Sequence, residues 1–592
     1  RSIPQAWKWS EADLAAQAAR TQQVDRQMQA MTPPRPISGT TAQQIKWRYS
    51  ARMWSEEVFE PAQLERLFVW LDDDAEFARQ RLGSANTNVI RSATSFDVEA
   101  WISSSANADK LDRLRLRMLR AQANAELFVC DYRPVLGSVV QSCYVRHGGA
   151  LAAPVCFFVV RDDELEPIAI QIEATNPHSY IFTPTDEADE RGDAWLLAKL
   201  WVANADQTWW FSGSHLFNTH SIDMIFGIAA LNQLASGPLT ESHPMLMLAR
   251  PHLVKVFDIN NAVYSMPTPY LSDGDKAYAG GGIYQVDQFC DRVLPTGRIG
   301  IYEIIDNLYR DYDFAGSALL SNMAERGLLD GPIAKVSFPY RDDAKVWWPA
   351  VEGLVRGVVE ASYADDAAVA ADLALGGWMK LVETAFNQNQ AQGPRFVWTA
   401  TKAGLVEVFT NLIFLCSVQH CSVNNSMFNS WAFTPNGPFS MQKAPPRDAA
   451  SVSQALVLAT LPDPTKVGND GSTSLATDME LIRNQVTFVM NGTAEVPELL
   501  AGDGSRESLY AAYPYPEGSP QRAAVDVFYV SVWLGSGSVK ARITANQRER
   551  IEAYFRGREP GVIPNSVSYY YLSVDAVGGM FLNAATTQAI QI

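Results

Sequence analysis

Two apolar segments of this chain carry polar groups that a folded interior must accommodate. Residues 214–236 are apolar, have a helical pattern and contain His215 and His220. A second apolar helix, predicted at residues 405–423, leads into His420 and Asn424. Polar groups in a protein core need partners. A metal ion shared between the two segments would satisfy all four groups at once.

The spacing within each pair predicts a different local geometry. His215 and His220 are five positions apart, which is about 140° of rotation on a regular α-helix, so they would not share a face. A π-type distortion brings residues i and i+5 into line. His420 and Asn424 are four positions apart and share a face of an ordinary helix. Each motif alone is weak evidence for a metal site. One histidine in the core and one at the surface would also explain the first pair.

Composition and charge exclude several classes of function. The chain has 592 residues, of which 47% are hydrophobic and 19% are charged, as in a globular protein. A formal net charge of −17 argues against binding nucleic acid or anionic lipid surfaces. No apolar run approaches the roughly 18 residues of a membrane span. The six cysteines are scattered and are predicted to be core residues, not a disulfide framework or zinc site.

The pattern along the chain predicts one large, mainly helical domain with a small strand-rich insert. Residues 1–71 are predicted to be an N-terminal helical extension, including a helix at 13–31, and residues 72–592 to be the main domain. Residues 155–160 and 168–172 read as the two strands of a hairpin. Loops are expected at 264–282 and 434–447, and His147 and His178 are expected to be solvated.

The motifs and their order resemble the lipoxygenase family over about residues 72–592. The segments that carry the resemblance are Leu127–Tyr132, Pro167–Ile172, Trp195–Val202, His215–His220, His243–His252, Phe338–Asp343, Gln419–Asn424, Trp431–Pro438 and Leu461-Pro462. The resemblance implies a mainly α fold, a single large helical lipoxygenase catalytic domain with a small β-rich insert. Nothing in the sequence reads as the N-terminal lipid-binding β-barrel of plant and animal members, as in bacterial-type forms.

The resemblance also implies a ligand set and a reaction. One non-heme iron per chain, with manganese as the alternative, would be held by the residues His215, His220, His420, Asn424 and the terminal carboxylate of Ile592. A metal-bound hydroxide would take hydrogen from the methylene between two cis double bonds of a polyunsaturated fatty acid. O₂ would then trap the radical as a conjugated diene hydroperoxide, with no side chain acting as acid or base. Nitrogen and oxygen ligands without thiolate suit iron.

The resemblance extends to the surroundings of the metal. Leu216, Val263 and Leu481 match substrate-channel positions, and either leucine is equally well explained as plain core. His243 and His252 are expected to make structural hydrogen bonds, not to bind metal. The chain is expected to be a monomer, and secreted or periplasmic, otherwise cytoplasmic.

The chain departs from the family pattern near the expected metal. Phe211 and Met427 stand where many lipoxygenases have glutamines that orient the ligands. Val263 is bulkier than the alanine or glycine that family members carry at the position associated with product handedness. These changes keep two alternatives open, a lipoxygenase-fold hydroperoxide isomerase and a non-catalytic lipid-binding protein. A zinc hydrolase is disfavoured, because no HExxH motif is present.

One prediction follows from the terminal carboxylate. Extending the chain past Ile592 should abolish metal binding, because the carboxylate becomes part of a peptide bond. The metal content and activity of a C-terminally tagged protein measure this. If the tagged protein kept its full iron content and full activity, the assignment of Ile592 as a ligand would be wrong.

Overall fold

The computed structural model describes most of the chain. The described residues are 37–49, 61–146, 149–257, 259–260, 294–388, 395–464, 498–575, 577–578 and 583–590, with residues 478, 482, 485 and scattered positions before 37. The helix predicted at 13–31 lies mostly outside these residues, and the loop expected at 264–282 and His147 lie wholly outside them.

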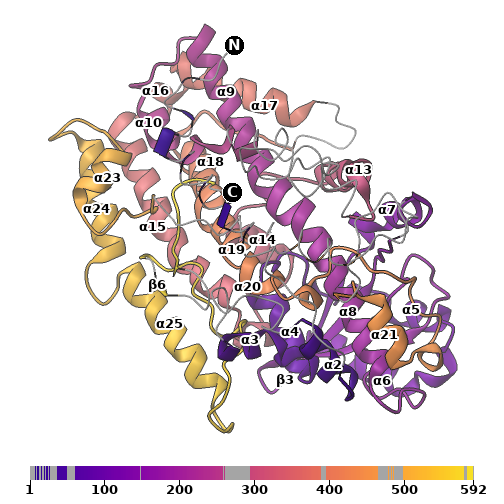
Figure 1. Cartoon of the computed structure of the whole chain (residues 1–592). Helices are drawn as coiled ribbons and strands as arrows, with labels where there is room; N and C mark the ends of the chain where they lie inside the picture. The colour runs from indigo at the N-terminus through magenta and orange to yellow at the C-terminus, as the bar shows by residue number, and fades with distance from the viewer. Residues whose placement is uncertain are drawn as a thin grey trace.

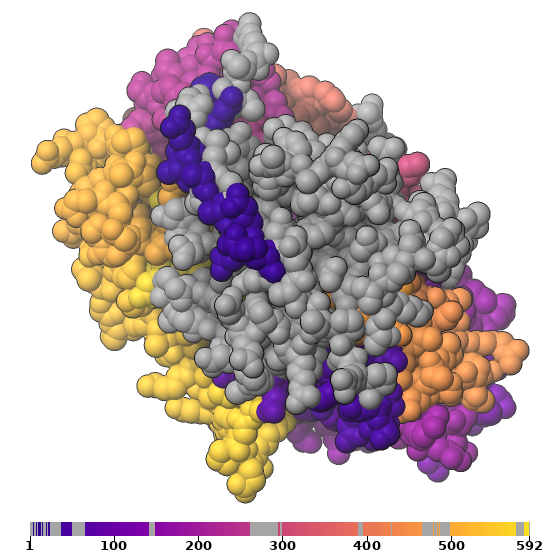
Figure 2. Space-filling view, in the orientation of Figure 1, coloured from indigo at the N-terminus to yellow at the C-terminus, as the bar shows by residue number. Residues whose placement is uncertain are grey.

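Helices dominate the described residues, as predicted, and the small sheet lies among helices in the lower part of the view (Figure 1). In chain order they are α2 Thr41–Arg48, α3 Pro61–Phe68, α4 Asp74–Gly83, α5 Val98–Ser104, α6 Asp112–Ala123, α7 Arg133–Arg146, α8 Asp193–Trp209, α9 Ile222–Ser236, α10 Pro244–Leu253, α13 Gly297–Arg310, α14 Leu319–Glu325, α15 Pro339–Ser362, α16 Asp366–Ala370, α17 Leu373–Asn387, α18 Lys402–Phe414, α19 His420–Asn424, α20 Met427–Trp431, α21 Gln454–Thr460, α23 Arg506–Ala512, α24 Pro520–Trp533 and α25 Val539–Tyr554. In the space-filling view, α23 to α25 form one edge (Figure 2).

The predicted hairpin is part of a five-stranded antiparallel sheet. The strands are β1 Arg91–Ser92, β2 Leu127–Asp131, β3 Val155–Arg161, β4 Glu164–Gln171 and β5 Ile181–Phe182, adjacent in that order. The β3–β4 turn consists of Asp162 and Asp163, whose φ angles are 52° and 60°. Two positive φ values are what a tight two-residue hairpin turn requires, and aspartate tolerates them better than most residues. The Arg-Asp-Asp sequence therefore marks the turn.

Both faces of this sheet are buried, which explains why β3 is continuously apolar. Side chains alternate between the faces of a strand. Cys156, Phe158 and Val160 join the main core, whereas Val155, Phe157 and Val159 face a smaller core. That smaller core includes Trp101 of α5 and Met118 of α6. The sheet thus packs between α5 and α6 and the helical body.

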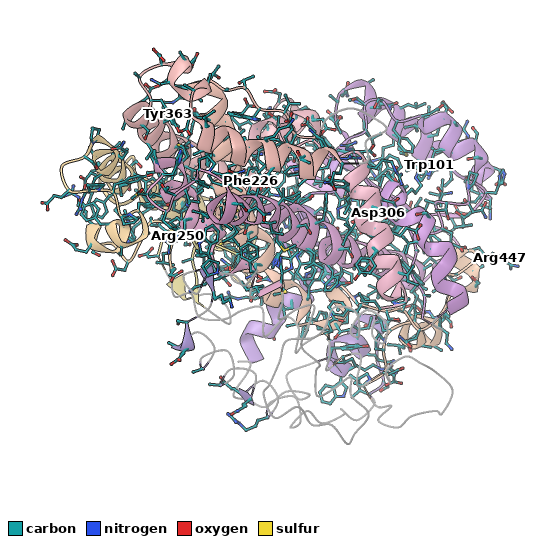
Figure 3. All side chains as sticks on the ribbon, turned by 90° about the horizontal axis from the view of Figure 1, so that it is seen from above. Trp101, Phe226, Arg250, Asp306, Tyr363 and Arg447 are labelled. Carbon is teal, nitrogen blue, oxygen red and sulfur yellow. The ribbon has the colours of Figure 1, made fainter. Side chains whose placement is uncertain are left out.

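Two long helical segments run through the main core. The first is α8, a π-helix η5 at Trp210–Ser221, and α9; the second is α18, a π-helix η7 at Leu415–Gln419, and α19. From above, Phe226 of α9 lies within the body whereas Arg447 projects at its edge (Figure 3). The segment Lys402–Trp431 is long and apolar enough to cross a membrane, but 89% of its apolar window is buried inside the protein. It is a core helix.

A buried ion pair attaches the C-terminal helix to the body. Arg550 of α25 donates from both Nη atoms to the two carboxylate oxygens of Asp343 on α15, at 2.9 Å each. Arg550 also donates to the carbonyl of Tyr569 at 2.9 Å, and Asn546 donates to Asp343 at 2.9 Å. Burial raises the pKa of Asp343, an effect that Arg550 opposes. The stability of the fold therefore depends on both Asp343 and Arg550, because either one alone would be a buried charge without a partner.

We expect Asp343→Ala to destabilise the fold strongly. It would leave a buried guanidinium uncompensated, which costs about 3–5 kcal/mol. The exposed pair Arg548–Glu552 lies on the same helix and offers a matched control, because surface pairs contribute little. Denaturant unfolding of both variants measures this, and an Asp343→Ala loss as small as that of Glu552→Ala would contradict it.

Candidate metal centre

A π-helix carries the first histidine pair. His215 and His220 both lie on η5, and their ring centroids are 4.8 Å apart. A π-helix places residue i+5 near residue i, so the two rings point to the same side of the helix. The distortion predicted from the five-residue spacing is therefore confirmed. Both side chains are buried.

The second segment contains a π-helix that the sequence did not predict. Residues 405–423 were expected to form one ordinary helix, but the α-helix ends at Phe414 and η7 follows. The regular helix then resumes as α19, which carries His420 and Asn424, as expected from their four-residue spacing. A wider turn rotates the residues that follow it, so η7 sets the direction in which His420 points. Nothing in the sequence of 415–419 marks this change.

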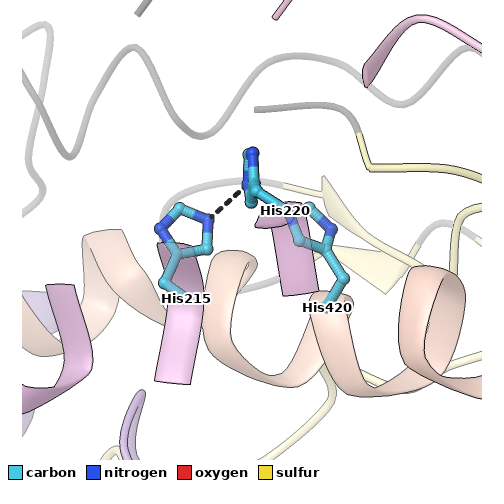
Figure 4. A group of neighbouring side chains, drawn as sticks. All are labelled: His215, His220 and His420. Atoms are coloured by element: carbon cyan, nitrogen blue, oxygen red, sulfur yellow. Dashed lines mark hydrogen bonds between the residues drawn. The ribbon is translucent and has the colours of Figure 1, made fainter. Parts of the chain in front are cut away.

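The two segments bring three imidazoles together (Figure 4). One ring nitrogen from each of His215, His220 and His420 lies within 4.8 Å of the other two. The Nε2 atoms of His215 and His220 are 3.3 Å apart. His420 stacks on His215 at 5.5 Å between ring centroids. Asn424 is buried one helical turn beyond His420.

The spacing of these nitrogens fits a metal ion. Two nitrogens held about 2.1 Å from one metal are about 3 Å apart at right angles and about 4.2 Å apart when opposite. The Nε2 atoms of His215 and His220, 3.3 Å apart, lie within this range. The 4.8 Å limit for the whole cluster exceeds the roughly 4.2 Å expected for opposite ligands by about half an ångström. Small ring rotations would close that gap. Imidazole nitrogens are ligands for zinc, copper, iron and nickel, so this buried cluster could hold a transition-metal ion.

Among the described residues, no cysteine or carboxylate joins the three histidines in the cluster. The thiol of Cys421 contacts the Thr587 hydroxyl at 3.2 Å, and burial raises its pKa. Asp223, three residues after His220, is fully buried, and burial raises the pKa of its carboxyl well above the ordinary value. Its side chain contacts the thiol of Cys416 on η7. Burial therefore disfavours the charged form of both groups.

Packing and hydrogen bonds hold the rings in place. Trp210 stacks on His215, with 5.3 Å between centroids and 9° between planes. Its indole N–H donates to the carbonyl of Val423 at 3.0 Å, which joins η5 to α19. The Nδ1 atom of His220 lies 2.9 Å from Oδ1 of Asn260. The stacking of Trp210 restricts the ring of His215, and the contact with Asn260 restricts the ring of His220.

A polar network behind η5 reaches the residue before His215. The Ser214 hydroxyl donates to Oδ1 of Asn86 at 2.8 Å, and the Asn86 amide donates to Asp206 at 2.9 Å. Arg81 pairs with Asp206 at 2.6 Å. All four side chains are buried. The network links α4 and α8 to η5, so it fixes the helix that presents His215.

The remaining predicted site residues divide into two groups. Leu216, Phe211 and Met427 are buried, and Phe211 packs against Phe439 with 6.3 Å between centroids. Val263, Leu481 and Ile592 lie outside the described residues, so their roles stay predictions. Sequence reasoning missed Asn260, Asn86 and Asp206, because each contact joins segments distant in the chain.

His243 and His252 make structural hydrogen bonds, as expected. His243 lies 2.9 Å from Asp372, and its Nδ1 accepts from the Met245 backbone at the start of α10. Nδ1 of His252 donates to the Gln588 carbonyl at 2.6 Å, so its Nε2 accepts from the Tyr513 hydroxyl at 3.0 Å. Burial lowers the pKa of His252 to about 4. His178 is exposed, also as expected.

We expect His420→Ala to lose metal and His252→Ala to lose mainly stability. The first variant removes one nitrogen of the cluster, whereas the second removes a hydrogen-bonded link between α10 and the Gln588 backbone. Metal analysis and thermal unfolding of both purified variants measure this. Equal metal content in the two would undo the distinction.

The burial of His252 also predicts a pH dependence of stability. Its folded pKa of about 4 lies below the ordinary 6.5, so the unfolded chain takes up the proton first. Its neutral form stabilises the fold above pH 6.5, and this contribution falls between pH 6.5 and 4, by about 1.4 kcal/mol per pH unit. Unfolding free energies of the wild type and His252→Gln across this window measure it. Parallel pH profiles for the two proteins would refute it.

Comparison with known proteins identifies the family. The family description "Lipoxygenase" matches residues 26–465. Polyunsaturated fatty acid lipoxygenase ALOX12 of Homo sapiens is 28% identical over 399 residues, which cover 67% of this chain and 55% of that protein. Hydroperoxide isomerase ALOXE3 of Homo sapiens is 29% identical over 341 residues, which cover 57% and 44%. The chain spans about half the length of these curated relatives.

Solved structures share the fold. A lipoxygenase from Fusarium graminearum superposes with a TM-score of 0.71 at 18% identity, covering 98% of this chain and 90% of that one. A lipoxygenase crystallised with arachidonate gives a TM-score of 0.70 at 18% identity, covering 100% and 76%. The family match spans most of the chain, and both η5, which carries His215 and His220, and α19, which carries His420, lie within it. The chain therefore belongs to the lipoxygenase family.

Proposed function

We propose that this protein is a non-heme iron dioxygenase that converts polyunsaturated fatty acids into conjugated diene hydroperoxides. The observation that carries the proposal is the cluster of His215, His220 and His420, buried where two π-helical segments meet. Family membership supports the same reading, because its relatives include a protein named as a polyunsaturated fatty acid lipoxygenase.

The chain's own groups would hold the metal and keep water away from it. His215, His220 and His420 would ligate, and Asn424 and the Ile592 carboxylate are the further ligands that we propose. Bound iron would supply the one-electron change that lets a hydrogen atom leave the methylene between two double bonds. The three imidazoles are almost entirely buried. Excluding solvent protects a carbon radical until O₂ reaches it.

The apolar residues around the cluster suit a hydrocarbon substrate. Leu216 follows His215 directly, Phe211 lies one turn before it, and Met427 lies beyond Asn424; all three are buried. A bis-allylic methylene offers no hydrogen-bonding group, so shape alone must position it. The sum of the reaction, one fatty acid plus one O₂ giving one hydroperoxide, requires no further reductant.

Hydroperoxide isomerisation is the alternative that a specific observation favours. Phe211 and Met427 cannot donate the hydrogen bonds that glutamines would give at those positions. One relative is named as a hydroperoxide isomerase. An altered environment of the metal could shift the balance from O₂ insertion to hydroperoxide rearrangement. A non-catalytic lipid-binding role would need a protein that holds no metal.

O₂ uptake measured together with conjugated-diene absorbance tests the proposal. The protein should end at Ile592, carry iron by metal analysis, and receive linoleate or arachidonate. We expect both signals to appear together, and both to be absent in His420→Ala. Fast consumption of a fatty acid hydroperoxide without O₂ uptake would replace the proposal with isomerisation. Metal-free wild-type protein that takes up no iron would replace it with the lipid-binding role.

A further inference from the structure

A buried amide from outside both histidine-bearing segments contacts the cluster. Asn260 lies forty residues beyond His220, and its side chain is 5% exposed. Its Oδ1 atom is 2.9 Å from Nδ1 of His220. Its Nδ2 atom is 3.1 Å from the sulfur of Met224 on α9. The amide therefore bridges the second imidazole of the cluster and the helix that follows it.

The two contacts together fix which way round the amide lies. A thioether sulfur has no hydrogen and can only accept, weakly, so the NH₂ group faces Met224. The carbonyl oxygen then faces the ring, and an amide oxygen can only accept. Nδ1 of His220 must therefore carry the proton and donate it to Asn260. The reverse orientation would set a carbonyl oxygen against the sulfur and lose that contact.

The tautomer decides which nitrogen is available to a metal. A neutral imidazole carries one proton, so protonation at Nδ1 leaves a lone pair on Nε2. Nε2 of His220 is the atom that lies 3.3 Å from Nε2 of His215, inside the cluster. The hydrogen bond to Asn260 thus aims the lone pair at the place where the three nitrogens converge. It also restricts rotation of the ring.

We propose that Asn260 is the positioning residue of this centre: it holds His220 as the Nδ1-protonated tautomer with Nε2 ready to bind the metal. This rests on the metal site of the proposed function. A neutral carbonyl does so without adding charge, whereas a carboxylate there would make the imidazole a stronger donor. The chain thus orients His220 with an uncharged amide.

Three variants separate this hydrogen bond from local packing. Asn260→Leu has nearly the same shape but cannot accept, so His220 can shift its proton to Nε2, where it competes with the metal. Asn260→Asp keeps the acceptor. Met224→Leu removes the sulfur contact of Asn260 and leaves its bond to His220. Should Asn260→Leu not fold, Asn260→Ser, whose side chain is too short to reach the ring, takes its place.

The readout is equilibrium binding of Co²⁺ to metal-depleted protein, measured by chelator competition and by the visible spectrum of the bound ion. We expect Asn260→Leu to bind roughly 10–100-fold more weakly than the wild type, the usual effect of removing such a partner. Asn260→Asp should bind at least as tightly as the wild type, and Met224→Leu should match it. Thermal unfolding of the metal-free proteins records any general loss of structure.

The outcomes distinguish this inference from the proposed function. Wild-type protein that binds neither Co²⁺ nor iron overturns both. Tight wild-type binding with unchanged affinity in Asn260→Leu overturns the role of Asn260 alone and leaves the metal site in place. An equal loss of affinity in Asn260→Leu and Met224→Leu assigns the effect to packing and also overturns it. Loss in Asn260→Leu with recovery in Asn260→Asp supports it.

Discussion

The contact between the π-helices η5 and η7, with α19, is the feature on which the rest of the molecule depends. The first segment is wound more widely than an α-helix where it carries His215 and His220, and the second is wound more widely just before His420. A π-turn is less favourable than an α-turn, so it persists only where surrounding packing maintains it. Trp210 supplies part of that packing, because it stacks on His215 and donates a hydrogen bond to Val423.

Uncharged contacts predominate among the described groups next to the cluster. Burial raises the pKa of the Asp223 carboxyl and of the Cys421 thiol, which favours their uncharged forms, and an amide contacts His220. The ion pair of Arg81 and Asp206 is linked to the residue before His215 through Asn86 and Ser214. A cation at the cluster would be held by the three imidazoles, with negative charge coming from the predicted terminal carboxylate. Such a ligand set leaves the reactivity of the metal sensitive to small changes in nearby polar groups.

Local chemistry made much of the fold and part of the site predictable. The five-residue spacing of His215 and His220 demanded a π-helix once both were taken to share a target, and the four-residue spacing of His420 and Asn424 demanded a regular turn. Asp162 and Asp163 marked the hairpin because aspartate tolerates positive φ. The expectation failed at η7, where residues 415–419 continue a helical segment and carry no signal for a wider turn.

The sequence by itself determined which groups can bind a metal, that they sit in apolar helices, and which family the motifs resemble, because residue type and short-range spacing are written in the chain. Only the tertiary structure decided where those groups converge and what orients them. Asn260 reaches His220, Asn86 reaches Ser214, and Arg550 reaches Asp343 across separations of 40, 128 and 207 residues. Contacts of that range depend on how whole helices pack, which no local pattern specifies.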